Sequence, residues 1–399
     1  MQARRKKRSR KFLLCDPNPP ADMVLFEDLA VADEQIQAME PQDEITVGCE
    51  VIISDLIEEV GGPGTDGDDE ATSERCCSSE NQATDSLACS CCAVCLAAKQ
   101  RRPLMRLQDF VYDTEGIHYY TGLEDYENCL RVFSSLCPEA NELVYKHSQV
   151  VKVPVEDQFL MTLMKLRRGV PDYELSRFFG CRKSVVSNIF VTWINFMAEM
   201  WSMLDVWPER DLIDYYMPPS FRKQHHETRV IVDGTEIPIA KPSDARAQQA
   251  SFSHYKNRCT LKALFGGTPG GLMSYCSHAY GGSTSDRAIV ERCDLLDKCE
   301  EGDTIMADRG FIVNDLCANK GIKLNIPTFM RGRSQLPSNT VLKDRNLAST
   351  RVHIERLINL AKTFKILKIE LDKAYVPLGS EIIGVCAMLT NFRESIVTK

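Results

Sequence analysis

Three acidic residues lie at the end of an apolar segment or beside one, and they are the first candidates for a catalytic or metal-binding role. Asp233 follows the β-branched run 230–232 in RVIVDGTE, which predicts a strand buried on both faces, and the Asp-Gly pair predicts an abrupt end of that strand. Asp308 follows a similar short apolar run in DTIMADRGF. Glu355 lies beside the apolar stripe of RVHIERLINLAKTF, whose spacing is helical. Each carboxylate is expected at the rim of a core, although an acid taken singly is more typical of a loop or surface than of a ligand site.

Taken together, the three acids suit chemistry on a phosphodiester. Their order along the chain is strand-Asp, hairpin, helix, strand-Asp and helix-Glu, the order in which a ribonuclease H-like fold brings acids from separate segments together. Two divalent ions about 3.5 to 4 Å apart can activate an attacking oxygen and stabilise a leaving one. Carboxylates are the hard oxygen ligands that Mg²⁺ prefers. The sequence therefore predicts a site for Mg²⁺ or Mn²⁺, with two ions expected, shared by Asp233, Asp308 and Glu355.

The elements that must position these acids form a predicted α/β domain over residues 225–399. After the strand that leads to Asp233, the segments LKALFGG and GLMSYCSHAYGG predict a hairpin with a Gly/Pro turn. A helix near DRAIVERCDLL, the strand to Asp308, a strand at IKLNIP and the long helix through Glu355 follow.

A helical region is predicted before this domain, over residues 105–220. Within residues 155–200, glycines at 169 and 180 separate three helical pieces, with Pro171 opening the second and Ser184 capping the third. Two helices joined through a glycine turn, the second preceded by CRKS, are typical of a helix-turn-helix, although an ordinary three-helix packing unit is nearly as good a reading. In the helix-turn-helix reading, phosphates and base edges would be contacted by Arg182, Lys183, Ser184, Ser187 and Asn188.

The charge of the chain is segregated, so its net value of −8 is misleading. Residues 1–11 hold seven bases and no acid, whereas residues 12–98 hold 20 acids and one base. The rest of the chain keeps 40 bases (48 less 8) and 36 acids (56 less 20), which makes residues 99–399 mildly basic. Residues 1–100 therefore form a predicted disordered tail, basic and then acidic, that cannot bury enough apolar surface to fold alone.

Cysteine usage and the N-terminus bear on location. Seventeen Cys without a signal peptide or a long apolar span indicate an intracellular, reducing compartment and no membrane partner. The basic N-terminus resembles a nuclear-import signal, and a merely solvated basic end is an equally good reading. The cluster Cys76–Cys95 contains the C-x-x-C pair Cys92–Cys95 but fits no standard finger spacing, so we do not predict a structural zinc there.

Several ordered blocks make the chain similar to a known family. From about residue 119 to 397 it resembles the DDE transposases of the PIF/Harbinger superfamily, through DGTEIPIAKP, SHYKNRCTLKALFG, YGGSTSDRAIVERCDLLDKCEEGDTIMADRGF, LNIPTFMRG, RVHIERLINLAKTFKIL and AMLTNF. The resemblance implies a ribonuclease H-like DDE nuclease domain in which Asp233, Asp308 and Glu355 are the catalytic, metal-binding triad. It also implies that Asp286 is a further or alternative ligand, although Asp286 could equally cap the helix that follows it. Phosphate contacts are implied for Tyr255, Lys256, Lys262 and Arg309.

The function implied by the resemblance is that of a nuclear, metal-dependent DNA endonuclease and strand-transferase acting on double-stranded DNA at transposon ends. The alternative is a domesticated DNA-binding or regulatory protein that keeps the fold without transposing. The resemblance also implies a separate Myb-like partner protein, because residues 1–100 contain no convincing DNA-binding domain of their own. A homo-oligomer stays an open alternative.

Overall fold

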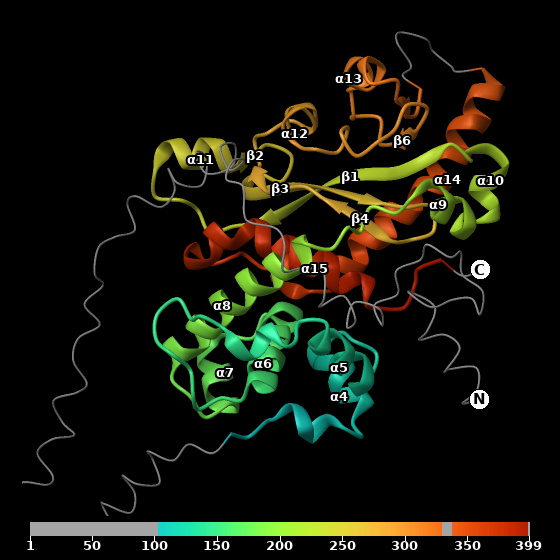
Figure 1. Cartoon of the computed structure of the whole chain (residues 1–399). Helices are drawn as coiled ribbons and strands as arrows, with labels where there is room; N and C mark the ends of the chain where they lie inside the picture. The colour runs from blue at the N-terminus through green and yellow to red at the C-terminus, as the bar shows by residue number, and fades with distance from the viewer. Residues whose placement is uncertain (1–102, 329–336, 398–399) are drawn as a thin grey trace, which may run out of the picture.

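The computed structural model describes residues 103–328 and 337–397 (Figure 1). The predictions for the N-terminal tail, including its import signal, its acidic segment and its cysteine cluster, lie outside the described residues. Within the described residues, we find no helix that combines the length and the apolar character needed to cross a bilayer.

The first part of the described chain is helical (Figure 1). Its helices are α4 (Thr114–Thr121), α5 (Tyr126–Ser134), α6 (Val155–Arg168), α7 (Asp172–Phe178) and α8 (Lys183–Ser202), with the short 3₁₀ turns η3 (Leu107–Phe110) and η4 (Glu139–Glu142). The predicted three helices between 155 and 200 are therefore present. The predicted cap is wrong, because α8 already begins at Lys183 and Arg182 is its N-terminal flanking residue, so Ser184 lies inside the helix.

Two short helices, α9 (Arg210–Tyr216) and α10 (Pro219–Gln224), lead into a mixed sheet. Its strands are β1 (Thr228–Pro238), β2 (Phe252–Ser253), β3 (Arg258–Gly267), β4 (Met273–Cys276), β5 (Tyr280–Gly281), β6 (Thr304–Met306) and β7 (Lys323–Asn325). The main order is β2-β3-β1-β6-β7, and β4 and β5 also pair with β3. β1 is antiparallel to β3 and parallel to β6, so the sheet changes from antiparallel to parallel at its central strand.

The predicted hairpin is confirmed, because β3 and β4 pair antiparallel across the Gly-rich turn. One expectation about β1 is wrong, because the Asp-Gly pair does not end it. Asp233 pairs with Phe265 and Gly234 pairs with Leu264, and the strand continues to Pro238. The reason is that Gly234 keeps an extended pairing with β3 instead of adopting a turn.

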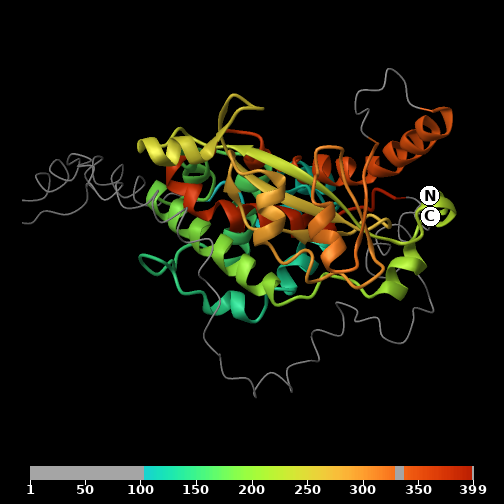
Figure 2. The same cartoon turned by 90° about the horizontal axis from the view of Figure 1, so that it is seen from above.

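Helices cover both faces of the sheet, as Figures 1 and 2 show together. One face carries α12 (Asp286–Arg292) and α13 (Asn314–Asn319), whereas the other carries α14 (Ser338–Ala361) and α15 (Gly379–Asn391). The short α11 (Ala245–Ser251) lies near β2 and β5, and the 3₁₀ turns η5 (Lys365–Leu367) and η6 (Lys373–Leu378) join α14 to α15.

Side chains of β1 alternate between the two resulting cores. Val230 and Val232 belong to the core under α12 and α13, and Ile231 belongs to the core under α14 and α15. All three are fully buried, which confirms the prediction of a strand covered on both faces. The core beneath α14 and α15 continues without a break into the helical region, where α8 packs against α15. The two regions therefore share one hydrophobic core.

Candidate active site

Asp233 lies where β1 loses its parallel neighbour. The β1–β6 pairing ends at Ile231 opposite Met306, so the next residues of β1 have no strand on that side. The chain leaving β6 places Asp308 two residues past Met306, near this uncovered edge. Asp308 is exposed, and one of its carboxylate oxygens accepts a hydrogen bond at 2.7 Å from the backbone amide of Arg309. Because β1 continues where β6 stops, Asp233 and Asp308 lie at the same edge of the sheet.

Glu355 reaches the same edge from α14. The buried side of this helix contains Ile354, Leu357 and Ile358, which pack on the sheet. This close packing depends on Gly267 of β3, since a Cβ there would come within 2.3 Å of the Leu357 side chain. Glu355 is next to this buried stripe and is about half exposed. The apolar stripe thus fixes the rotation of the helix and with it the direction of the carboxylate.

Arg351 connects the three acids. Its guanidinium lies 2.8 Å from Glu355 Oε1, 3.7 Å from Asp308 Oδ1 and 4.0 Å from Asp233 Oδ2. Arg351 is itself only 15% exposed, so this positive charge lies among the acids and has little contact with solvent. The bridge to Glu355, one helical turn along α14, is therefore only one of three contacts. Carboxylates from a strand, a loop and a helix converge on a single cation.

The electrostatics of Asp233 show how crowded this edge is. The pKa of Asp233 is raised from 3.8 to about 6, mainly by burial and then by the negative charges of Asp308 and Glu355, while Arg351 and the Gly234 amide act in the opposite direction. One arginine does not offset three acids. The site therefore has an excess of negative charge that favours a second cation or a bound proton.

The chemistry of these residues suits a divalent ion better than their present spacing does. Over residues 103–328 and 337–397, no three His, Cys, Asp or Glu side chains are already close enough to hold a metal ion. The donor chemistry nevertheless fits, because the three side chains are hard carboxylate ligands that already surround one positive charge. An ion bound here would have to replace Arg351 in this role.

Asp286 approaches Gly234, the residue after Asp233, but does not cap its helix. The cap of α12 is Ser285, whose hydroxyl accepts from the Ala288 amide. Asp286 instead pairs with Lys262 at 2.9 Å, and a Cβ at Gly234 would come within 3.0 Å of its carboxylate. The capping alternative is therefore wrong, and Gly234 is required for the approach of Asp286 to β1.

Among the predicted phosphate contacts, Lys262 differs from the others because it is mostly buried against an acid. Tyr255 and Lys256 lie at the exposed turn between β2 and β3, where the Lys256 ammonium stacks 4.5 Å from the Tyr255 ring centre. Arg309 is also exposed. These three side chains are available to a ligand, whereas Lys262 is already neutralised by Asp286.

The predicted DNA-contacting residues of α8 separate into two groups. Arg182, Lys183 and Ser184 are exposed at the start of the helix, as predicted. Asn188 is 4% exposed, and its amide accepts from the His147 backbone and donates to that of Ser148, so its predicted place on an exposed face is wrong. Ser187 is half-buried, and its hydroxyl lies 3.3 Å from that of Tyr375 in η6. Helical packing turns the side of α8 that carries Ser187 and Asn188 inward.

Two basic residues near the acids, Arg351 and Lys362, contribute to the electrostatics of the site although the sequence motifs did not indicate them. Arg351 contacts all three acids. Lys362 is half-buried, and burial lowers its pKa, as does the charge of Lys256, whereas Asp233 and Glu236 act in the opposite direction. Both lie a whole number of helical turns from Glu355, four residues before it and seven after it, so helical spacing was the signal that could have found them.

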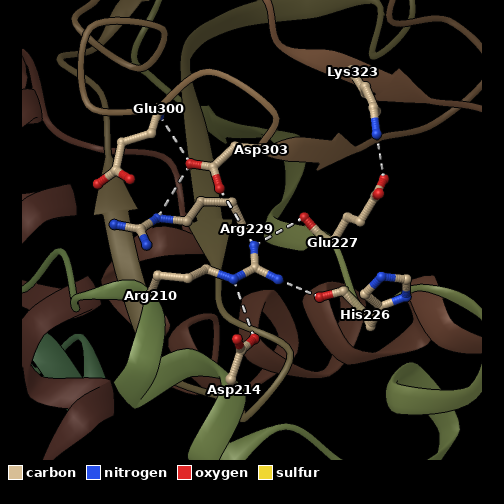
Figure 3. Close-up of polar contacts among 8 residues, drawn as sticks. All are labelled: Arg210, Asp214, His226, Glu227, Arg229, Glu300, Asp303 and Lys323. Carbon is tan, nitrogen blue, oxygen red and sulfur yellow. Dashed lines mark hydrogen bonds and ion pairs between the residues drawn. The ribbon is translucent and has the colours of Figure 1, made fainter.

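A second charged cluster lies at the opposite ends of the same strands, and Figure 3 shows it. Arg229 at the start of β1 lies 3.6 Å from Asp303, which directly precedes β6, and both are almost fully buried. Arg210 of α9 approaches the same carboxylate at 3.3 Å. Nearby, Lys323 pairs with Glu227 at 2.7 Å. In this cluster the acids are paired with bases, whereas around Arg351 three acids share one base.

Two family models match this architecture. Residues 232–391 match the model described as DDE superfamily endonuclease, and residues 151–202 match the model described as helix-turn-helix of DDE superfamily endonuclease. Comparisons with curated proteins and with solved structures found no significant match. The first match contains all three acids, and the second contains α6, α7 and α8.

The chain therefore carries a DDE superfamily endonuclease domain preceded by its helix-turn-helix domain, which is the architecture of a transposase-like nuclease. DDE endonuclease domains use divalent metals.

Proposed function

We propose that this protein is a metal-dependent DNA endonuclease that cleaves phosphodiesters at transposon ends and transfers the resulting strands. The observation that carries the proposal is the convergence of Asp233, Asp308 and Glu355 on the Arg351 guanidinium. The change from antiparallel to parallel pairing at β1 supports a ribonuclease H-like fold. The PIF/Harbinger subtype rests on the sequence blocks quoted above.

In this proposal, Asp233, Asp308 and Glu355 hold Mg²⁺ or Mn²⁺. A divalent ion bound there supplies Lewis-acid polarisation of the phosphate and lowers the pKa of an attacking water. Arg351 holds the three carboxylates together before the ion arrives, since they would otherwise repel one another. Asp286 and Lys262 form a neutral pair against Gly234, the residue after Asp233, so Asp286 acts as a positioning residue or an alternative ligand.

Duplex DNA binding is assigned to the helix-turn-helix, with Arg182, Lys183 and Ser184 at the exposed start of α8 as its contacts. The N-terminal residues of a recognition helix are the ones that reach phosphates and base edges. Tyr255, Lys256 and Arg309 supply phosphate contacts closer to the acids. Residence in the nucleus, a Myb-like partner and self-association stay predictions that accompany this function.

The direct test is a nicking assay on duplex DNA with candidate terminal repeats, with Mg²⁺ or Mn²⁺ and with EDTA. The wild-type protein is expected to nick only with the divalent ion. Glu355→Gln keeps the shape of the side chain but removes its charge, so nicking should collapse while folding and duplex binding survive. Glu199→Gln, an exposed acid on α8 far from the carboxylates, is the matched control and should nick like the wild type. Normal nicking by Glu355→Gln would refute the three-acid site.

One observation favours the alternative of a DNA-binding or regulatory protein without transposition. Arg351 already occupies the position between the acids, and no ready cluster of metal ligands exists in the described part of the chain. Under this alternative, the wild type binds duplex DNA specifically but shows no nicking with either ion. The same assay, run beside a binding measurement, therefore separates the two functions.

A further inference from the structure

The helix-turn-helix region is fixed to the sheet domain by a buried polar cluster. Lys165 of α6 is 7% exposed, pairs with Asp172 of α7 and donates to the hydroxyl of Tyr375 at 2.8 Å. The same hydroxyl lies 3.0 Å from the Asp172 carboxylate and 3.3 Å from the Ser187 hydroxyl. Because Tyr375 belongs to η6, all three helices of the region hold one element of the endonuclease domain. The start of α8 thus has a fixed position relative to the acids.

Residues 365–373 lie between this junction and the sheet. Leu371 pairs with Ile239, just past the end of β1, and the two backbones exchange hydrogen bonds with their neighbours. Lys373 donates to the Ser243 hydroxyl at 3.1 Å. This segment thus connects the helix-turn-helix with the end of the strand that carries Asp233.

Exposed cations occur at the start of α8, at the turn between β2 and β3, and along residues 365–373. Two acids interrupt them, Glu370 and Asp372, and the Asp372 carboxylate is partly used because it accepts from the Ala374 amide at the start of η6. The remaining exposed charges are positive and come from three separate elements, namely Arg182, Lys183, Lys256, Lys365, Lys368 and Lys373.

Lys362 links this row of cations to the active site. Burial is the main cause of its lowered pKa, and the positive charges of Lys256 and Lys368 lower it further. The opposing influence of Asp233 and Glu236 shows that the same ammonium lies within electrostatic reach of the acids. Lys362, which directly follows α14, is therefore influenced both by the exposed Lys256 and Lys368 and by Asp233.

We propose that residues 365–373 form a bridging phosphate track, so that one DNA duplex contacts the start of α8 and the three carboxylates at the same time. The ligand is the phosphate backbone of double-stranded DNA, bound by Lys365, Lys368 and Lys373 without reading base sequence. This inference deepens the proposed function and rests on it. Together with the rigid junction at Tyr375, the track sets the distance between the DNA segment bound at α8 and the phosphodiester that is cleaved.

The test measures duplex binding by the full-length protein in EDTA at several salt concentrations. The double variant Lys368→Ala/Lys373→Ala changes neither the helix-turn-helix nor the acids. It should lower affinity about tenfold or more near 0.1 M salt and reduce the slope of log K against log salt by about 1 to 2, because each lost phosphate contact contributes about 0.9. Lys368→Arg/Lys373→Arg keeps both charges and should bind like the wild type. Melting curves of both variants should match that of the wild type, since both side chains are exposed.

The matched control is Lys223→Ala/Lys343→Ala, which removes two exposed lysines from α10 and from the first part of α14. Figure 1 places these elements at the other end of the sheet from α11 and β2, so affinity and salt slope should not change. An unchanged slope in Lys368→Ala/Lys373→Ala, or an equal loss in the control, would overturn the track while leaving the proposed nuclease intact. Failure of the proposed function shows separately, as absent nicking with normal binding.

Discussion

The two ends of the β1–β6 pair carry the same kinds of side chain in opposite arrangements. At the start of the strands, Arg229 and Asp303 are 2% and 6% exposed at the side chain, and Arg210 joins them, so the acid is fully matched. At the other end, Asp233, Asp308 and Glu355 share Arg351 and are 31%, 58% and 46% exposed. The first cluster is closed and balanced, whereas the second is open and has more acids than bases.

This difference separates a structural ion pair from a binding site. A buried pair must be matched, because an unpaired charge in the interior is very costly. An excess of acids at a rim destabilises the free protein but leaves it ready for a cation. Asp233, whose pKa is raised to about 6 by burial and by the two neighbouring acids, shows this cost, and the matched Arg229–Asp303 end avoids it. Four substitution series test whether the two ends differ in this way.

The largest expected effect is on cleavage. Asp308→Asn should reduce metal-dependent nicking by about three orders of magnitude, because charge stabilisation by a bound metal is worth several kcal/mol. Glu227→Gln removes an exposed acid at the opposite end of the sheet, where it pairs with Lys323, and should leave nicking unchanged. Single-turnover nicking rates compare the two. Equal losses would mean that the two ends do not differ in function.

The reverse contrast is expected for stability. Asp303→Asn leaves Arg229 buried without its counter-charge and should lower the free energy of unfolding by about 3 kcal/mol. Asp308→Asn should change it by no more than about 0.5 kcal/mol, because that carboxylate is exposed. Urea denaturation in EDTA measures both. A stable Asp303→Asn protein would contradict the structural role of the matched cluster.

Removing the arginine that the three acids share should sharpen the difference between the ends. Arg351→Gln leaves the acids without a positive charge, so Mn²⁺ should bind roughly tenfold or more tightly, since nearby unit charges interact by a few kcal/mol in a partly screened site. Arg356→Gln, an exposed arginine of the same helix, should leave Mn²⁺ affinity unchanged. Calorimetric titration of metal-free protein with Mn²⁺ gives the answer. Weaker binding by Arg351→Gln would show that the arginine assists the ion and does not compete with it.

The smallest expected effect concerns pH. The folded-state pKa of Asp233 is raised from 3.8 to about 6, so the folded protein holds this proton more tightly than the unfolded chain does. Protonated Asp233 therefore stabilises the folded protein fully below about pH 4, and this stabilisation is lost as pH rises to about 6. In EDTA, the melting temperature of the wild type should fall relative to that of Asp233→Asn over this range. Parallel pH profiles of the two proteins would show that Asp233 is not perturbed.

Sequence reasoning found the acids and most of the elements that carry them. Buried β-branched runs identified β1 and the end of β6, and the stripe through Ile354 and Leu357 identified α14. The hairpin of β3 and β4 followed from its Gly/Pro turn. Local patterns succeed here because alternation and helical spacing record which side of a segment is buried.

Most of the errors share a physical cause. The strand did not end at Gly234, Ser184 did not cap α8, Asp286 did not cap α12 and Asn188 was not exposed. Ser184 lost the cap because α8 begins one residue earlier, whereas for Gly234, Asp286 and Asn188 a partner distant in the sequence overrode the local preference. For Asn188 that partner is the backbone of His147 and Ser148, about 40 residues earlier.

The sequence by itself determined that three acids lie at the rims of buried segments, that a helical region precedes a mixed α/β domain, and that the charge is segregated along the chain. Only the tertiary structure decided that β6 stops beside Ile231 while β1 continues, which places Asp308 and Asp233 at one edge, where they share Arg351 with Glu355. It also decided that Arg351 lies among all three acids, and that Tyr375 joins the helix-turn-helix to the endonuclease domain. The reason is that strand register and helix rotation are set by packing between segments far apart in the chain, which no local pattern records.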